Sequence, residues 1–277
     1  MVMTLLFVAV AALVMYWTIS AFAAMERELL AALKLPAAGN VCSVTTALWK
    51  STAFDNVIAR MAGESLVFAD IRGRHPLVLA YAMFIFQIAP LLTLIVSAPR
   101  IAADLRSGAA RYWLVRVTRN EWSLGKFFGE AAMLAAAMLA GGLAAWGVAA
   151  CRLQGMDGVR LLPDVLDWTA RAWAYAFAWL GMFCGVSHVA TSGGKATALA
   201  ILAMMGAAVF PTMLANFVPE AEPWTWLTQL DALVPSGSAA LMWRRAPGAV
   251  VRGVVQLSTL SFLYLSFGTW VFCRRDV

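Results

Sequence analysis

The sequence predicts an all-α integral membrane protein with six transmembrane helices, for three reasons. Apolar residues make up 62% of its 277 residues and charged residues only 13%, where a soluble domain has roughly a quarter. The mean hydropathy is +0.77. The apolar residues also gather in runs of about 20, the length that a helix needs to cross a bilayer. A water-soluble fold is excluded, because too few polar residues remain to cover its surface.

Six apolar runs are the predicted transmembrane helices. They cover residues 5–25, 77–96, 127–150, 168–188, 196–217 and 250–272. The first is interpreted as a retained helix and not as a secretory signal, because no Lys or Arg precedes it and it exceeds a signal's apolar core of about 7–15 residues. Arg171, near the start of the fourth, can extend its side chain to the headgroups. Without internal repeats or linkers, residues 1–277 are predicted to form one membrane domain.

Positive charge predicts the orientation of these helices. The loop between the second and third runs is dominated by basic residues, opposed only by Asp104 and Glu121, and should stay in the cytoplasm. Its basic residues are Arg100, Arg106, Arg111, Arg116, Arg119 and Lys126. Alternation then puts both termini in the cytoplasm and residues 26–76 outside. Apolar spacing between Ser43 and Ile71 predicts a helical element on that outer side.

The same basic loop, over residues 101–126, carries the strongest functional pattern. Apolar residues recur every four positions at Ile101, Leu105, Ala109 and Trp113, which predicts a short amphipathic helix. Thr118 is followed three residues later by Glu121. That spacing is typical of a capping box, in which each side chain accepts a hydrogen bond from a free backbone N–H. The third membrane helix is therefore predicted to begin here.

Several short motifs resemble one known family. From Asp104 the loop reads acidic residue, Arg, Ser, Gly, an Arg-Tyr pair, a short basic turn and then Leu-Gly-Lys-Phe-Phe-Gly; the chain ends on Phe-Cys-Arg-Arg-Asp-Val. Leu233-Val234-Pro235 falls where the last outer loop of that family commonly has a Pro. The pattern resembles the permease subunits of type-2 ABC exporters. The sequence departs from that family at Asp104, where Glu is usual, and at Val117-Thr118-Arg119, where a Pro-Ser-Arg-like turn is usual.

The resemblance implies that Ile101 to Tyr112 is a coupling helix seated on a separate cytoplasmic ATPase. The residues assigned to that contact are Asp104, Leu105, Arg106, Gly108, Arg111, Tyr112 and Trp113. It further implies a bacterial inner membrane and a pair of permeases, identical or related, with two ATPase subunits that bind ATP and Mg²⁺. The alternative from residue chemistry alone is that these arginines meet anionic lipid headgroups and fix the topology.

Other functional classes find less support in the sequence. Ser192-Gly193-Gly194-Lys195-Ala196 lacks both the earlier Gly and the Ser or Thr after Lys that a phosphate loop needs, so no cofactor is expected on this chain. Ser187 and His188 are interpreted as polar helix-end residues, because the other histidine, His75, is predicted beyond the opposite membrane face. No catalytic residue is therefore predicted. The spans lack Asp, Glu and Lys at mid-depth, which disfavours a proton- or sodium-driven carrier.

Three further predictions concern metal binding, packing and the outer loop. The four cysteines have no paired spacing for a metal, and a bond between Cys42 and Cys151 is disfavoured. Small residues in the third span predict tight helix packing. They form one ridge at Ala132, Ala136, Ala140 and Ala144, and a second at Ala137, Gly141, Ala145 and Ala149. An alternative function, a scaffold that anchors or matures a partner protein without transport, would use the long outer loop 26–76.

Overall fold

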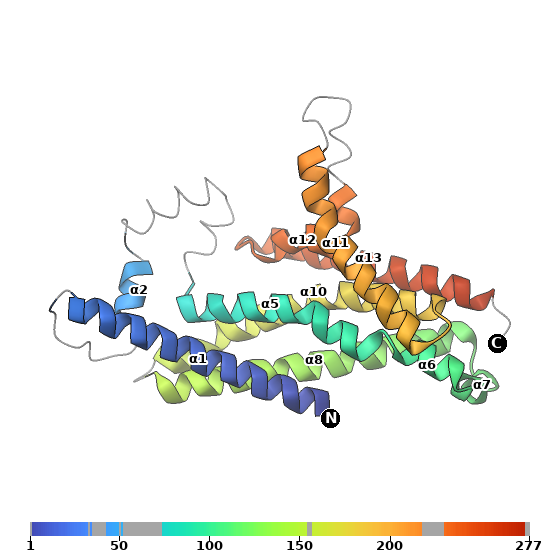
Figure 1. Ribbon diagram of the computed structural model, residues 1–277, viewed down its shortest axis with the longest axis horizontal. Coiled ribbons are helices and arrows are strands. Elements are labelled where there is room, and N and C mark those ends of the chain that lie inside the picture. The colour runs from blue at the N-terminus through green and yellow to red at the C-terminus, as the bar shows by residue number, and fades with distance from the viewer. Residues whose placement is uncertain are drawn as a thin grey trace. The chain divides into compact units, whose positions relative to one another are not determined.

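The computed structural model describes residues 2–32, 34, 43–49, 51, 74–153, 157–217 and 230–274. Every element of regular secondary structure in those ranges is a helix, as Figure 1 shows. The predicted all-α class is confirmed there. Of the helical element predicted within 43–71, the described part is α2, Ser43–Trp49. Cys42, and with it the question of a bond to Cys151, lies outside the described residues.

Six long helices account for most of the described chain. They are α1 (Val2–Ala32), α5 (Pro76–Ser97), α8 (Arg119–Arg152), α10 (Leu162–Val189), α11 (Gly193–Phe217) and α13 (Pro247–Cys273). Each contains one of the six predicted spans. Five of them are long and apolar enough to cross a membrane: α1, α5 with the short helix that follows it, α8, α11 and α13. The chain is therefore built as a multi-pass membrane protein.

The remaining long helix, α10, differs from the other five. It contains the predicted span 168–188, but Trp, Tyr and His side chains lower its hydropathy, and it is not among the five apolar spans. Nearly every residue between Arg171 and Gly185 is buried. A helix that is apolar and buried on all sides forms a core rather than a lipid-facing surface. The count of six membrane-spanning helices therefore stays a prediction.

Five short helices complete the described elements. They are α2, α6 (Arg100–Arg106), α7 (Ala109–Leu114), α9 (Asp157–Arg160) and α12 (Pro235–Met242). Both α6 and α7 lie in the basic loop between α5 and α8. The contacts of this loop define the candidate site described below.

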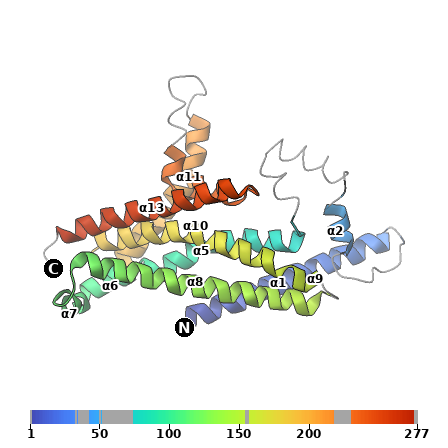
Figure 2. The ribbon, with the colours of Figure 1, turned by 180° about the vertical axis from the view of Figure 1, so that it is seen from behind.

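The chain forms two compact units. The first comprises the described parts of residues 1–85, 136–170 and 243–245. Within it, α1 lies against the second half of α8 (Figures 1 and 2). A Cβ on Gly141 would stand 2.5 Å from the Phe7 ring, so only glycine permits this approach. At the end of α8, the Arg152 guanidinium lies 4.4 Å from the Tyr16 ring centroid and donates to Ser20 Oγ over 3.2 Å.

The two predicted ridges of small residues on α8 differ in burial. Gly141, Ala145 and Ala149 of the second ridge are buried, whereas Ala132 and Ala136 of the first ridge are exposed. Ala140 and Ala144 are half-buried. Ala132 and Ala136 are exposed on the surface of this chain, so their packing role stays a prediction. The ridge that α8 turns toward Phe7 contains a glycine, where the backbone can come closest.

The second unit comprises the described parts of residues 86–135, 171–242 and 246–277. In both views α13 runs beside the second half of α10. Ser261 Oγ donates to the Phe177 carbonyl over 2.7 Å, and a Cβ on Gly181 would stand only 2.3 Å from Ser261 atoms. The rings of Phe127 and Phe177 meet edge to face at 5.0 Å between centroids. Close backbone approach and aromatic packing therefore hold α8, α10 and α13 together here.

Candidate functional site

The basic loop folds as two short helices and not as one continuous amphipathic helix. The break falls at Gly108, whose φ of 74° lies in the left-handed region that glycine adopts at low cost. Ser107, just before it, donates its hydroxyl to the Asp104 carbonyl over 3.2 Å. The predicted helix from Ile101 to Tyr112 is therefore wrong as a single rod. A glycine that follows a polar residue near a helix end is a common C-terminal stop.

One side of this loop is anchored in the core of the second unit. Ile101 and Ala110 are fully buried, and Leu105 and Leu114 pack against the same cluster. The cluster also contains Trp122, Phe127, Ala131, Phe177, Leu180, Cys184, Leu265 and Phe272. These residues come from α8, α10 and α13. A movement of α6 or α7 would therefore disturb three long helices at once.

The other side of the loop is exposed. Tyr112 has 82% and Trp113 58% of its surface accessible. Arg106 and Arg111 are exposed as well. Aromatic and arginine side chains together are the residue types most enriched at the energetic centres of protein interfaces. The predicted contact residues therefore divide into an anchored Leu105, a helix break at Gly108 and an exposed aromatic and basic face.

Two polar contacts connect α6 to the long helices. Asp104 Oδ2 lies 2.7 Å from Lys126 Nζ on α8. The backbone N–H of Ala102 donates to Ser187 Oγ on α10 over 3.0 Å. The Asp104 carboxylate is thus paired with Lys126 of the same chain. It supports the position of α6 instead of facing outward with the arginines.

The predicted capping box at the start of α8 is confirmed. The Thr118 N–H donates to Glu121 Oε2 over 2.8 Å, and the Glu121 N–H donates to Thr118 Oγ1 over 3.3 Å. Behind it, Arg119 donates to the Phe272 carbonyl at the end of α13 over 3.0 Å. This end of α8 is therefore fixed to the end of α13.

A hydrogen-bonded chain of side chains lies buried next to α6. His188 Nδ1 is 2.7 Å from the Cys184 carbonyl, which can only accept, so Nδ1 carries the hydrogen. In the neutral ring Nε2 then accepts from Ser123 Oγ at 2.9 Å. The same hydroxyl lies 2.9 Å from Thr269 Oγ1. Ser187 and His188 do lie at the end of α10, as predicted, but both are fully buried.

Sequence reasoning missed the partner of His188. Ser123 lies 65 positions away in the chain and has no recognisable motif around it. It is fully buried beside His188. Because a substrate could reach this pair only if α8 and α10 separated, the geometry favours a structural link over a hydrolytic dyad.

Glu130 on α8 is the second residue that sequence reasoning missed. It is only 3% exposed. The Cys184 thiol donates to its Oε2 over 3.7 Å, and Ser97 lies close enough to interact with the carboxyl. Among the described residues, however, neither Glu130 Oε1 nor Ser97 Oγ makes a hydrogen bond. Glu130 stands three residues inside the predicted third span, near its end and not at mid-depth.

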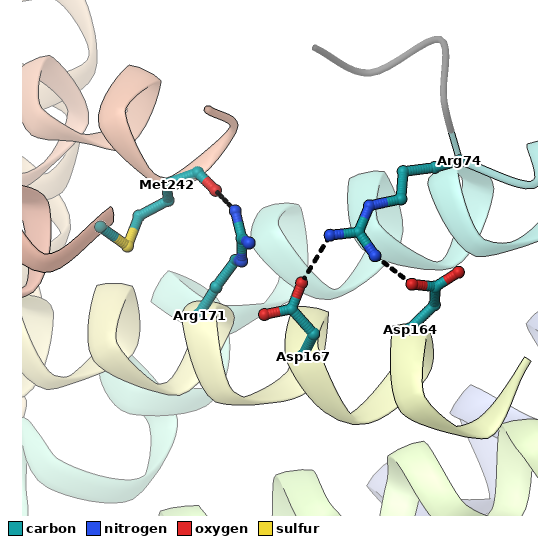
Figure 3. A network of polar contacts seen from close by, with 5 residues as sticks. All are labelled: Arg74, Asp164, Asp167, Arg171 and Met242. Atoms are coloured by element: carbon teal, nitrogen blue, oxygen red, sulfur yellow. Dashed lines mark hydrogen bonds and ion pairs between the residues drawn. The ribbon is translucent and has the colours of Figure 1, made fainter. Parts of the chain in front are cut away.

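Figure 3 shows a second group of charged residues, at the start of α10. Arg74 donates to Asp164 and, over 3.0 Å, to Asp167. One turn further along α10, Arg171 donates to the Met242 carbonyl over 2.8 Å, at the last residue of α12. The expectation that Arg171 reaches the headgroups is therefore wrong. A helix C-terminus carries partial negative charge, which explains why a buried arginine is found against it.

The Ser-Gly-Gly-Lys segment begins α11. Ser192 Oγ accepts the Lys195 N–H over 3.4 Å, as a helix cap does. The segment therefore forms the start of a helix.

A search with protein-family models finds no match to this chain, and no curated protein matches its sequence.

Proposed function

We propose that this chain is the membrane-spanning permease subunit of an ATP-driven ABC exporter, in which α6 and α7 couple a separate cytoplasmic ATPase to the membrane helices. The observation that carries the proposal is that one side of this loop is buried in the core and the other side is exposed. Ala110 is fully buried in the core cluster, and Tyr112 and Trp113, two and three residues later, are 82% and 58% exposed. A partner that binds Tyr112 and Trp113 would therefore displace residues packed among α8, α10 and α13.

The exposed face also indicates the chemistry of the partner. Arg111 directly precedes the aromatic pair, Arg106 ends α6, and both arginines are exposed. Guanidinium groups pair with carboxylates in two-pronged geometry, and an indole ring fills an apolar pocket. The ATPase surface should accordingly offer an apolar pocket for Trp113 with acidic groups around it.

Motion would pass through the packed helices α6 and α7, which meet at Gly108. Packed elements shift between discrete arrangements rather than deform continuously. The Asp104–Lys126 ion pair and the Ala102–Ser187 hydrogen bond tie α6 to α8 and α10, so these contacts would carry a displacement into the bundle.

The assembly would contain two permease chains, identical or related, and two ATPase subunits that bind ATP and Mg²⁺. The positive charge of the loop favours a cytoplasmic position for α6 and α7, and the proposal puts both termini on that side of a bacterial inner membrane. The scaffold alternative depends on residues 26–76, and the described part of that loop contains no observation that favours it.

The test is ATP hydrolysis that co-purifies with the tagged chain from its own membranes. Trp113→Ala, and separately the double variant Arg106→Glu with Arg111→Glu, should each lose most of this activity and still yield a folded chain. Trp17→Ala is the matched control, because Trp17 is an exposed tryptophan on α1, which belongs to the other compact unit. The proposal fails if the parent chain brings down no ATP hydrolysis, or if a cysteine at position 111 is labelled from outside the cell.

A further inference from the structure

An apolar groove lies between α10, α11 and α13 in the second unit. Its volume is about 430 Å³. Its walls include Met182, Val186 and Val189 from α10, Leu199 and Ala203 from α11, and Phe267 from α13. This size suits a hydrocarbon chain, and the walls offer it almost only dispersion contacts.

Close contact between α10 and α13 lies beside this groove, where Gly185 is one of the lining residues. A Cβ on Gly268 would stand 2.5 Å from Cα of Gly185, and a Cβ on Gly185 would stand 2.5 Å from the Tyr264 carbonyl oxygen. The backbones of α10 and α13 therefore touch next to the groove.

A positive charge lies on the same face of α11 as two residues that line the groove. Lys195 precedes Leu199 by four residues and Ala203 by eight, so all three lie on one face of α11. Four residues of helix correspond to about 6 Å along the axis. Lys195 is exposed, and its ammonium group makes no hydrogen bond or ion pair within the part of the chain that the structure describes.

We propose that this groove binds one acyl chain of an anionic glycerophospholipid, with the lipid phosphate paired to Lys195. The proposal rests on the orientation in the proposed function, which puts the start of α11 at the cytoplasmic face. Anionic lipids are abundant in that leaflet, and an unpaired lysine there attracts them. A zwitterionic lipid would fit the apolar walls equally well but would gain less from Lys195.

The lipid would lie next to the candidate coupling loop. The first turn of α11 packs on α6, where Ala102, Ala190 and Ala196 form a buried cluster. A lipid held by Lys195 and Leu199 would thus contact the helix end that supports α6. Binding of the lipid and the position of α6 would then be linked.

Photo-crosslinking of the purified chain, without any ATPase, tests the proposal. The chain is placed in phosphatidylcholine nanodiscs with a trace of phosphatidylglycerol that carries a diazirine on its acyl chain. We expect label on Val189, Leu199 and Phe267. Lys195→Glu should lower labelling at least about fivefold, since one lysine near an anionic surface is worth about that factor in affinity, and Lys195→Arg should preserve it.

Two controls separate the groove from the general lipid annulus. Ala203→Trp fills the groove and should abolish the label, whereas Leu202→Trp, at an exposed position outside the lining, should leave it unchanged. A phosphatidylcholine probe with the same acyl chain should label the groove several-fold less. Equal labelling by both probes, insensitivity to Lys195→Glu, or crosslinks from position 203 to a second copy of the chain would each overturn the proposal.

The outcome does not depend on the ATPase. If Trp113→Ala leaves co-purified ATP hydrolysis intact while lipid labelling behaves as expected, the proposed coupling role fails and the lipid site stands. If labelling fails while Trp113→Ala removes the ATPase, the opposite holds.

Discussion

Ser123 on α8 and His188 on α10 form a buried hydrogen bond of 2.9 Å, and the same serine hydroxyl lies 2.9 Å from Thr269 Oγ1 on α13. Three long helices are thus linked through one small side chain. Ser187, the neighbour of His188, accepts the Ala102 N–H from α6. The link between the helices and the link to the candidate coupling loop therefore meet at the end of α10.

Removal of the Ser123 hydroxyl should weaken this junction. We expect Ser123→Ala to lower the free energy of unfolding by about 0.6–1.7 kcal/mol, the range measured for hydrogen bonds between membrane helices. Thermal or denaturant unfolding in detergent measures the loss. Thr259→Ala is the matched control, because Thr259 bonds only to a carbonyl of its own helix, α13, at an exposed position. An equal loss in both variants would mean that the junction contributes nothing specific.

Close packing of α1 on α8 gives a second prediction. Gly141→Ala places a Cβ at 2.5 Å from the Phe7 ring, so the ring must move, and we expect a cost of about 1–3 kcal/mol. Gly147→Ala, on the same helix with nothing within 4 Å, should be neutral or slightly stabilising. Unfolding of the two variants in one detergent compares them directly. A Gly147 variant as unstable as the Gly141 variant would contradict this account.

Properties that depend on short stretches of sequence could be predicted. Apolar runs of about 20 residues located all six long helices, and the Thr118–Glu121 pair located the start of α8. The stop at Gly108 has a local signal too, since Ser-Gly is a common helix end, although the apolar spacing across it is typical of one continuous helix.

The buried polar contacts could not be predicted, because they depend on residues far apart in the chain. Ser123 and His188 are 65 positions apart, and nothing local to either residue indicates the other. The neighbours of the buried Glu130 carboxyl likewise come from other helices, α5 and α10, which lie beside it only in the folded chain. A hydropathy pattern describes how apolar a helix is, but it does not show which of its faces meets which neighbour.

The helix break at Gly108 gives a third prediction. An alanine would have to hold φ near 74°, which costs about 1–2 kcal/mol, or else the loop must change shape. We expect Gly108→Ala to reduce co-purified ATP hydrolysis and Gly108→Asn to reduce it less, because asparagine tolerates the left-handed region. A Cβ at this position would meet no atom within 4 Å beyond its own chain neighbours, so a steric clash of the Cβ cannot explain a loss. Identical activity of the two variants would exclude backbone conformation as the cause.

The Asp104–Lys126 ion pair gives a fourth prediction, in which stability and coupling separate. Both side chains are about one third exposed, so solvent screens the pair and Asp104→Asn should change the free energy of unfolding by less than about 1 kcal/mol. The same variant should lower co-purified ATP hydrolysis if the pair holds α6 on α8. The exchange Asp104→Lys with Lys126→Asp should recover part of that loss. A double variant worse than either single variant would argue against a direct pair.

Glu130 gives the last prediction, which depends on shape and hydrogen bonding at a buried site. Glutamine has nearly the same volume, can still accept from the Cys184 thiol, and adds an N–H₂ donor for Ser97. We therefore expect the free energy of unfolding of Glu130→Gln to lie within about 1 kcal/mol of that of the parent chain. Glu130→Ala removes the acceptor of the thiol and leaves a void among α5, α8 and α10, which should cost about 1–3 kcal/mol. If glutamine proves as damaging as alanine, the negative charge itself is needed, and Arg100 and Lys126, the two cations that attract this carboxyl, would be its partners.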